Sequence, residues 1–227
     1  MLNKLKTLVK ELGPLNSLLY VVHSVLSNPT NGWARIERFL LVAQPVPIAP
    51  RLPPSRAASL EIRQLMPGDH LLTQCPRPEA VIADRYSQGA ICLAAVKNDV
   101  LQGFLWLIHG GYEEDVARVR FVLPESGHAV WDFDVYVAPA YRLGFTFLKL
   151  WDAADTYLRE RGVIWSMSRI SAFNTGSLSS HGRLGAHSIG TATFIILGPL
   201  QVMFSSLAPR LYLSIGKYRP LLVLPDQ

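Results

Sequence analysis

The sequence predicts an α/β fold of the α+β kind, with a mixed, mostly antiparallel central sheet, flanking helices and an N-terminal helical appendage. Three observations predict it. Residues 129–137 alternate apolar and polar side chains and lead through a proline turn into a long amphipathic stretch. Two apolar runs joined by Lys97-Asn98-Asp99 indicate a hairpin, and residues 1–28 repeat apolar positions at helical spacing.

Composition narrows the function. The chain has 227 residues, is 49% hydrophobic and 17% charged, and carries a net charge of +5. This is enough for one generous core with an appendage, and the mild positive charge suits an anionic cofactor, an anionic membrane surface or an acidic carrier protein. A dense basic patch with interleaved aromatic residues is missing, which argues against a nucleic-acid partner. Two cysteines and scattered histidines form neither a disulfide framework nor a metal site, so a reducing cytoplasm is expected.

The N-terminal segment, residues 1–28, is apolar along one side, and Gly13-Pro14 should divide it into two short helices. It is too interrupted for a signal peptide or a spanning helix. It either packs on its own domain or on a second subunit, as in a homodimer, or it lies peripherally at the inner membrane face with its lysines toward the headgroups. The repeating apolar positions are Leu2, Leu5, Leu8, Leu12, Leu15, Leu19, Val22 and Leu26.

The next segments lead into the main domain. Residues 33–46 favour a strand or a short amphipathic segment. Five prolines within residues 44–54 favour an extended connector, so we expect an N-terminal part at 1–54 and a main domain at 55–227. A strand at 60–65, two short helices near 69–73 and 79–86, and the hairpin 90–96/100–109 follow. Residues 112–115 are expected to form a solvated acidic loop or to attract a cationic amine, and residues 116–123 to form the next strand.

The stretch from Trp131 to Ala186 carries the functional interpretation. Alternation within residues 129–137 places Asp132, Asp134 and Tyr136 on one face and the apolar residues on the other. Pro139 ends this strand, and the turn after it leads into a helix from about 145 to 161 whose buried stripe contains Leu148, Trp151, Ala154 and Leu158. A strand running into a helix N-terminus presents unpaired backbone N–H groups, and such a place binds phosphate.

A second strand and a short helix follow. Arg169 on this strand is a candidate anion contact or a member of a buried ion pair. Asn174 is a candidate cap of the helix, and His181 lies on that helix. Residues 190–199 fit a strand that closes the sheet. Residues 200–227 should form edge strands or fold back onto the N-terminal helix.

Two motifs in this stretch resemble the coenzyme-A-binding core of the GNAT superfamily of N-acetyltransferases. The family's acidic strand residue followed by Val-x-Pro-x-Tyr-Arg corresponds to the run from Asp134 to Arg142. Its pattern Asn-x-x-Ala-x-x-x-Tyr-x-Lys-x-Gly-Phe appears, with every spacing kept, as Asn174, Ser177, His181, Arg183, Gly185 and Ala186. The resemblance covers roughly residues 60–200. The sequence departs from the family in its loop glycines after Arg142 and in having His181 where a tyrosine is usual.

The resemblance implies roles for these residues. Asp134 would be the base or orient the amine, with Asp132 in reserve, and His181 would donate a proton to the leaving thiolate. Substrate contacts would involve Asp132, Tyr136 and Arg169. The donor, acetyl-CoA or another acyl-CoA, would be held by Val135, Val137, Arg142, Leu143, Gly144, Phe145, Thr146 and Asn174, without a metal.

The predicted function is therefore transfer of an acetyl or other acyl group from acyl-CoA to a small amine by direct attack. One alternative is a long-chain acyltransferase that uses acyl carrier protein or acyl-CoA, because Phe145 and Phe147 are apolar. A second alternative is a non-catalytic binding or scaffold protein with this fold, because the loop glycines are irregular.

Overall fold

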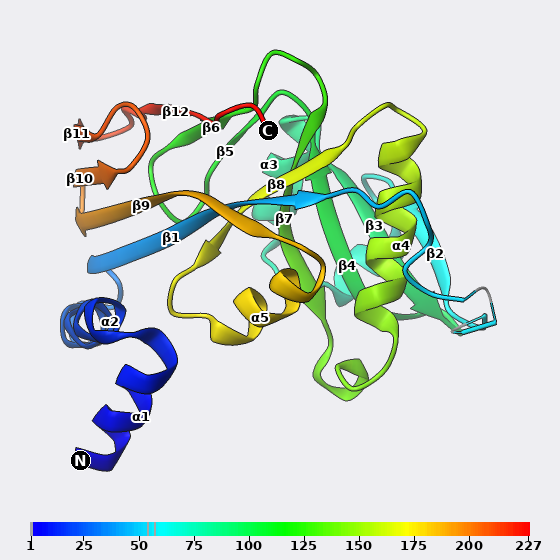
Figure 1. The fold of residues 1–227 in the computed structure, drawn as a ribbon, viewed down its shortest axis with the longest axis horizontal. Helices are drawn as coiled ribbons and strands as arrows, with labels where there is room; N and C mark the ends of the chain where they lie inside the picture. Colours follow the sequence, from blue (N-terminus) through cyan, green and yellow to red (C-terminus); the bar gives the residue numbers. More distant parts are fainter. Residues whose placement is uncertain (1, 54, 57) are drawn as a thin grey trace. The chain divides into compact units, whose positions relative to one another are not determined.

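A computed structural model describes residues 2–53, 55–56 and 58–227 (Figure 1). The chain forms two compact units. The first consists of Met1–Gln44, Glu113–Val122 and Ser168–Gln227, and the second of Pro45–Tyr112 and Leu123–Met167. The division into residues 1–54 and 55–227 stays a prediction.

The second unit contains an antiparallel sheet with neighbours in the order β7, β4, β3 and β2. Its elements are β2 (Glu61–Leu65), the 3-10 helix η1 (His70–Gln74), α3 (Glu79–Ser87), β3 (Ile91–Lys97), β4 (Val100–Ile108), β7 (Ala129–Val137), the 3-10 helix η2 (Pro139–Tyr141) and α4 (Thr146–Arg159). The predicted hairpin is confirmed as β3 and β4. Asn98 and Asp99 both have positive φ, 51° and 61°, as a two-residue turn of type I′ requires.

Helix α4 covers one face of this sheet and packs on β2, β3, β4 and β7 (Figure 1). Its Leu150 is fully buried against Leu60 and Ala95. Three members of the predicted stripe, Trp151, Ala154 and Leu158, are also fully buried, whereas Leu148 is only partly so. The amphipathic pattern therefore identified the packed side of the helix.

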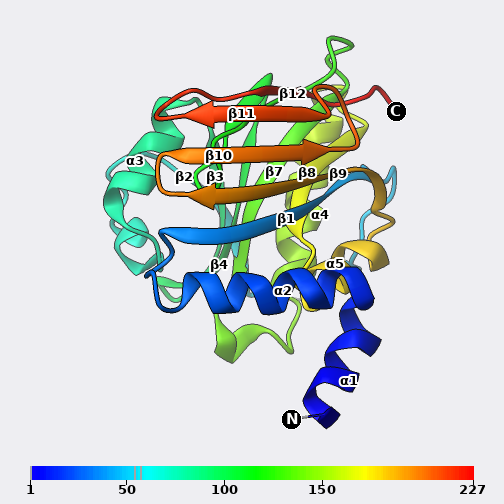
Figure 2. The same cartoon turned by 90° about the vertical axis from the view of Figure 1, so that its left-hand side faces the viewer.

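The first unit contributes four antiparallel neighbours to the strand order, β11, β10, β9 and β1 (Figure 2). Its elements are α1 (Leu2–Leu12), α2 (Pro14–Ser27), β1 (Ala34–Pro45), β6 (Arg120–Val122), α5 (Thr175–Arg183), β9 (His187–Leu197), β10 (Leu200–Ser205), β11 (Leu211–Ile215) and β12 (Leu221–Val223). Strands β5 (Gly111–Glu113) and β8 (Trp165–Ser171) each have residues in both units. Of the two arrangements predicted for residues 200–227, the strands are the one that forms.

The two predicted N-terminal helices are confirmed, with Gly13 at a φ of 77° between them. Along one side, α2 packs on its own unit. The ring of His23 lies 2.6 Å from the carbonyl oxygen of Ile36, and Tyr20 meets Phe173 edge to face. Among the described residues, no helix is long and apolar enough to cross a membrane.

Two predictions for residues 112–123 are wrong. The segment is not a solvated acidic loop, because Tyr112 and Glu114 are buried, with 2% and 1% exposure. The predicted strand 116–123 is reduced to β6, which pairs in parallel with β12. An ion pair with Arg169 holds Glu114 inside the first unit.

Candidate functional site

Strand β7 carries a β-bulge at Asp134 and Val135. Phe133 pairs with Trp106 of β4, and Tyr136 pairs with Phe104, so two residues of β7 oppose Leu105 alone. Asp134 has a φ of 48°, a left-handed conformation that few non-glycine residues adopt. A bulge interrupts the hydrogen-bond ladder and redirects side chains, and bulges are frequent next to active sites.

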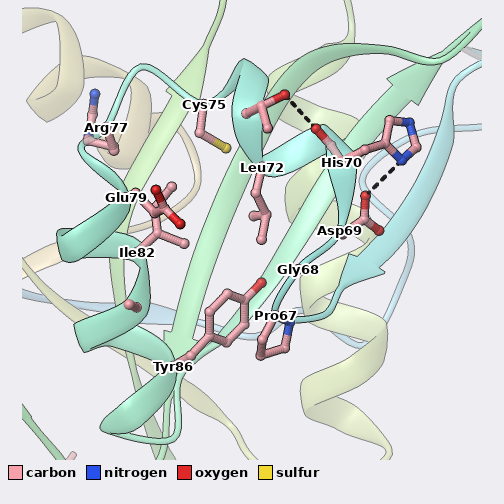
Figure 3. A pocket seen from close by; sticks show the side chains of 12 residues that line it. Pro67, Gly68, Asp69, His70, Leu72, Cys75, Arg77, Glu79, Ile82 and Tyr86 are labelled. Atoms are coloured by element: carbon pink, nitrogen blue, oxygen red, sulfur yellow. Dashed lines mark hydrogen bonds and ion pairs between the residues drawn. The ribbon is translucent and has the colours of Figure 1, made fainter.

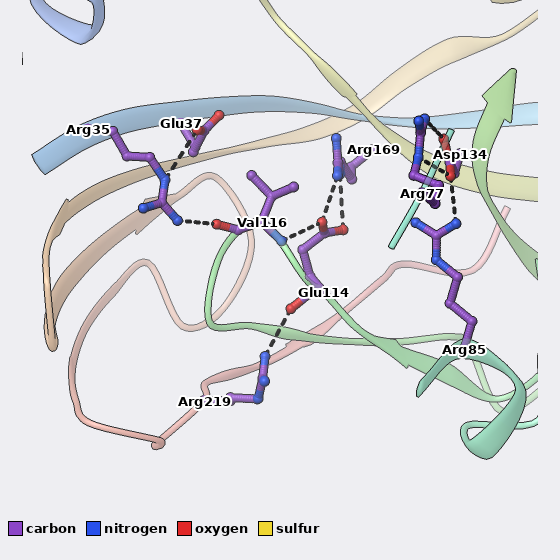
Figure 4. A network of polar contacts seen from close by, with 9 residues as sticks. All are labelled: Arg35, Glu37, Arg77, Arg85, Glu114, Val116, Asp134, Arg169 and Arg219. Carbon is purple, nitrogen blue, oxygen red and sulfur yellow. Dashed lines mark hydrogen bonds and ion pairs between the residues drawn. The ribbon is translucent and has the colours of Figure 1, made fainter. Parts of the chain in front are cut away.

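Two arginines converge on the Asp134 carboxylate (Figure 4). Arg77 donates from Nε to Oδ2 at 2.8 Å and from Nη2 to Oδ1, and Arg85 donates from Nη1 to Oδ2 at 2.5 Å. Both arginines come from the segment between β2 and β3. The two guanidinium groups therefore occupy both oxygens of the carboxylate.

Aromatic rings surround these arginines. The guanidinium of Arg85 lies 5.4 Å from the centre of the Trp106 ring and 5.3 Å from that of Phe133. That of Arg77 lies over Phe104 and Tyr136. The rings screen the ion pairs from water and add cation–π attraction.

The predicted strict alternation of β7 is therefore wrong at the bulge. Phe133 was expected opposite Asp134, yet its ring and the Asp134 carboxylate contact the same guanidinium. Asp132 was expected on the face open to chemistry, but it is 1% exposed and accepts a hydrogen bond from Ser166 Oγ at 2.8 Å. Its role in substrate binding stays a prediction.

The turn after β7 is open to solvent at the residues predicted to hold the cofactor. Arg142, Leu143, Gly144 and Phe145 are all exposed. Nε of Arg142 donates to the Val137 carbonyl at 3.1 Å, which fixes the guanidinium beside the end of β7. A Cβ built on Gly144 would meet only ordinary contact, the Tyr141 carbonyl at 3.4 Å. A ligand can therefore approach this backbone closely.

Helix α4 begins directly after this turn, at Thr146. The first N–H groups of a helix have no partner within it and favour anions. The Thr146 side chain is buried and donates to Gln102 at 3.3 Å, so its hydroxyl is already engaged within the protein. The guanidinium of Arg56, a residue that no sequence motif singled out, lies 5.5 Å over the Phe145 ring and brings a second cation to this turn. The residues at this turn suit a diphosphate.

A pocket of about 500 Å³ opens in the same unit, between η1 and α3 (Figure 3). Asp69 and Glu79 supply two carboxylates, and Arg77 connects the pocket wall to Asp134. The lining residues are Pro67, Gly68, Asp69, His70, Leu72, Thr73, Cys75, Arg77, Glu79, Ile82, Ala83 and Tyr86.

Two titratable groups in the pocket wall stay protonated at neutral pH. Burial, assisted by the charge of Asp134, raises the pKa of the Cys75 thiol to about 11. Burial also raises the pKa of the Tyr86 phenol, whose hydroxyl donates to the Leu65 carbonyl at 2.9 Å. Neither group is prepared to act as a nucleophile or a base.

Three predicted site residues belong to the first unit. Asn174 caps α5, accepting from Ser177 N at 3.0 Å, as one of its two predicted roles requires. His181 is buried, with Nδ1 3.2 Å from Gln44 Oε1. No group of three or more histidine, cysteine or acidic residues in the described parts of the chain could hold a metal ion.

Arg169, the third, forms a buried ion pair, which was one of its two predicted roles (Figure 4). It donates to both oxygens of Glu114, from Nε at 3.0 Å and from Nη2 at 2.6 Å, and lies 4.5 Å over the Phe39 ring. Burial raises the pKa of Glu114, while the Arg169 guanidinium opposes that change. The pair has the geometry of a structural contact.

Arg77, Arg85 and Arg56 were not predicted as site residues. Residues 67–86 contained the arginines that reach Asp134, but no local pattern distinguishes them from surface arginines. Arg77 and Arg85 lie 57 and 49 positions before Asp134, so only the tertiary fold brings them to it.

No description of a protein family matches the sequence, and no curated protein is similar to it. Solved structures do share its fold. A conserved protein of unknown function from Staphylococcus epidermidis is 14% identical with a TM-score of 0.50, over 74% of this chain and 64% of that one. A GCN5-related N-acetyltransferase from Sphaerobacter thermophilus is 16% identical with a TM-score of 0.46, over 78% of this chain and 54% of that one.

An aminoglycoside acetyltransferase from an uncultured soil metagenomic sample, solved with sisomicin, is 13% identical with a TM-score of 0.40. The match covers 56% of this chain and 88% of that one. The chain thus spans less than two thirds of the staphylococcal and Sphaerobacter proteins. At these identities the likeness concerns the fold alone.

The order of elements agrees with the resemblance of the sequence motifs. A strand, two short helices and a hairpin precede the bulged strand β7, and the Arg142 turn, α4, β8, α5 and β9 follow it. The Asn174 motif begins at the cap of α5, and the acidic motif begins at the bulge. The chain therefore has the mixed, mostly antiparallel α+β fold with flanking helices that its sequence predicted, and the staphylococcal protein shares that fold.

Proposed function

We propose that the protein is an N-acyltransferase that moves an acetyl or other acyl group from acyl-CoA to a small amine by direct attack. One observation carries the proposal: within a single compact unit, the bulge at Asp134 is followed by an exposed, cationic turn at a helix N-terminus. A bulge offers unpaired amides to a carbonyl, and the turn offers donors and guanidinium groups to a diphosphate.

The reaction needs an amine without its extra proton. The ammonium first loses one proton to solvent, and the neutral nitrogen attacks the thioester carbonyl carbon. The C–N bond forms as the C–S bond breaks, the nitrogen gives up a second proton, and the leaving thiolate takes up one, so that one proton is released overall. Backbone N–H groups at Val135 and Val137 are the proposed donors to the carbonyl oxygen, where negative charge develops.

The donor molecule supplies the activated thioester, and the chain's own residues bind it. Arg142 and Arg56 are the proposed partners of the diphosphate, together with the amides of Leu143, Phe145 and Thr146; the Gly144 amide already donates to the Tyr141 carbonyl at 3.1 Å. Asn174 stays a proposed contact to the donor's arm in addition to its capping role. These contacts would hold the thioester beside the bulge. A bimolecular step then becomes effectively unimolecular, because the thioester is already positioned for attack.

The acceptor fits the pocket between η1 and α3. Asp69 and Glu79 in its wall would attract a cationic amine. Asp134 has two guanidinium partners, which favours orientation of the acceptor through Arg77 over proton abstraction. Tyr136 and Arg169 stay proposed substrate contacts, and His181 stays the proposed proton donor to the thiolate.

Two alternative functions are each supported by one observation. Leu143 is fully exposed and Phe145 is 41% exposed at the turn, which suits a long acyl chain delivered by acyl-CoA or acyl carrier protein. The irregular glycines after Arg142 suit a non-catalytic binding or scaffold protein. A cytoplasmic location fits the unpaired thiols of Cys75 and Cys92.

Titration calorimetry with CoA, acetyl-CoA and palmitoyl-CoA distinguishes these functions. Binding of both CoA and acetyl-CoA, followed by acetylation of amines in a mass-spectrometric screen, is the expected result. Preference for palmitoyl-CoA would favour the long-chain enzyme. Heat from none of the three would remove the transferase proposal and favour a scaffold.

A further inference from the structure

One face of the sheet in the first unit is apolar and turned outward. Leu200 and Phe204 of β10 pair directly with Ile215 and Leu211 of β11, so their side chains share a face. The exposed fractions on this face range from 37% to 62%. We call it the outer apolar face, and it consists of Leu197, Leu200, Phe204, Leu211, Leu213 and Ile215.

The opposite face of the same strands is buried and contains polar groups. Gln201 and Ser214 are fully buried there, beside the buried Met203 and Phe194. A sheet with one solvated face normally places polar residues outward. Here the solvated face is the more apolar one. Apolar side chains that stay in contact with water do not contribute to the stability of the folded unit.

Helix α2 likewise exposes apolar side chains to solvent. Leu15, Leu18, Val21 and Val25 fall on one side of the helix and are 40% to 66% exposed, while Ser17 is buried. Pro14–Ser27 contains no aspartate, glutamate, lysine or arginine. We call these four residues the α2 stripe.

Trp33 links the stripe to the sheet. It follows α2, it is 58% exposed, and its ring lies against Gly198 in the turn between β9 and β10, where a Cβ would come within 2.5 Å of it. Figure 2 shows α2 alongside β1, with β9, β10 and β11 on the same side and no helix over them. Tryptophan is favoured at the boundary between membrane and water.

Charge in the first unit accompanies this apolar surface. The unit holds twelve basic and six acidic residues, whereas the second unit holds ten and eleven. Arg210 immediately precedes β11, Lys217 follows it after Gly216, and Lys6 and Lys10 lie on α1. All four are exposed, and none has an ion-pair partner among the described residues.

We propose that the outer apolar face and the α2 stripe dock on an anionic lipid surface. The leucines, isoleucine, valines and Trp33 would enter the boundary between headgroups and acyl chains, and the four basic residues would meet the headgroups. A second copy of the chain fits less well, because it would bring one unit with a net charge of +6 against another.

The test is flotation of the full chain with vesicles of phosphatidylcholine alone and of phosphatidylcholine mixed with phosphatidylglycerol. We expect the chain to float with the mixed vesicles, to float far less with neutral ones, and to be released by high salt. A chain that stays at the bottom with both kinds of vesicle would end the proposal.

Paired variants separate the two contributions. Removing two basic groups with Arg210→Gln and Lys217→Gln should weaken partitioning into mixed vesicles by about 30-fold, since each is worth about 1 kcal/mol near an anionic surface. The pair Leu213→Ser and Ile215→Ser should weaken it by on the order of tenfold or more on burial of apolar area.

The matched control is the pair Val100→Ser and Ile164→Ser, which changes two exposed apolar residues of the second unit. It should float like the unchanged chain. Circular-dichroism melting confirms that each variant is folded. Equal flotation of all variants would contradict the proposal, as would a dimer in sedimentation equilibrium that Leu213→Ser and Ile215→Ser dissociate. Neither result depends on acyl transfer.

Discussion

At the residue scale, Asp134 is the position where fold and chemistry meet. Its carboxylate neutralises Arg85, whose side chain is 5% exposed, and orients Arg77 at the pocket wall. Removing one partner of a buried ion pair leaves an uncompensated charge, which typically costs about 3 kcal/mol or more. The same residue should therefore influence stability and turnover.

Asp134→Asn should lower turnover at least tenfold, equivalent to about 1.4 kcal/mol, because Arg77 loses its charged partner. Steady-state kinetics with a responsive amine measure it. The matched control is Asp155→Asn, which weakens another buried arginine pair, with Arg51, in the same unit. The control should lose stability and keep its turnover. Unchanged turnover in Asp134→Asn would exclude Asp134 from the mechanism.

Cys75 provides a pH-dependent prediction. With a pKa raised to about 11 by burial, its thiol is protonated at every lower pH, and the reactive thiolate increases about tenfold per pH unit until that value. Alkylation by iodoacetamide at pH 8 should therefore be slow in the folded chain and should accelerate as the pH rises.

The control is the chain unfolded in denaturant, in which both cysteines should react rapidly at pH 8. Burial also raises the pKa of Cys92, so it should add no fast phase in the folded state. Rapid modification of the folded chain at pH 8 would contradict the burial argument. It would also make a thiol nucleophile in the pocket conceivable.

At the element scale, the end of β7 depends on close contact with β4. Gly103 pairs with Val137, and a Cβ on Gly103 would come within 2.6 Å of the Tyr136 carbonyl oxygen. Leu150 and Thr146 of α4 would also lie at 3.3 Å. A glycine here allows the bulged strand, its neighbour and the start of α4 to pack together.

Gly103→Ala should lower the free energy of unfolding by about 1–3 kcal/mol and weaken acyl-CoA binding, because β7 and the Arg142 turn must shift. Urea denaturation and calorimetry measure the two effects. Gly182→Ala in α5 is the control. A Cβ there meets nothing within 4 Å, and alanine should stabilise the helix by about 0.5–1 kcal/mol. Equal behaviour of both variants would refute the packing argument.

At the scale of the whole molecule, neither compact unit is a continuous piece of chain. The chain passes between them after Gln44, Tyr112, Val122 and Met167. Strands β5 and β8 each contain residues of both units. Unfolding of one unit would therefore disrupt a strand that also belongs to the other. Two cores connected in this way should lose their structure together.

We therefore expect one cooperative thermal transition, with equal calorimetric and van't Hoff enthalpies. Arg51→Ala tests the coupling, because it leaves the buried Asp155 of the second unit without its guanidinium partner and should cost about 3 kcal/mol. The single transition should move to lower temperature and stay single. Two separate transitions, with only one of them shifted, would show that the units unfold independently.

The sequence by itself determined the local elements and their order. The alternation of residues 129–137, Pro139 and the stripe around Trp151 predicted β7, its turn and α4, and Gly13-Pro14 predicted two N-terminal helices. Asn174 was recognised as a possible cap from its position before a helix. Such features depend on neighbours within a few positions, where backbone geometry and side-chain periodicity act directly.

Only the tertiary structure decided the partners. It placed the bulge at Asp134, brought Arg77 and Arg85 to that carboxylate, buried Asp132 and paired Arg169 with Glu114. It also turned the apolar side of β10 and β11 outward. An alternating strand does not reveal which of its faces is covered or where its register shifts. That depends on through-space packing between segments distant in sequence.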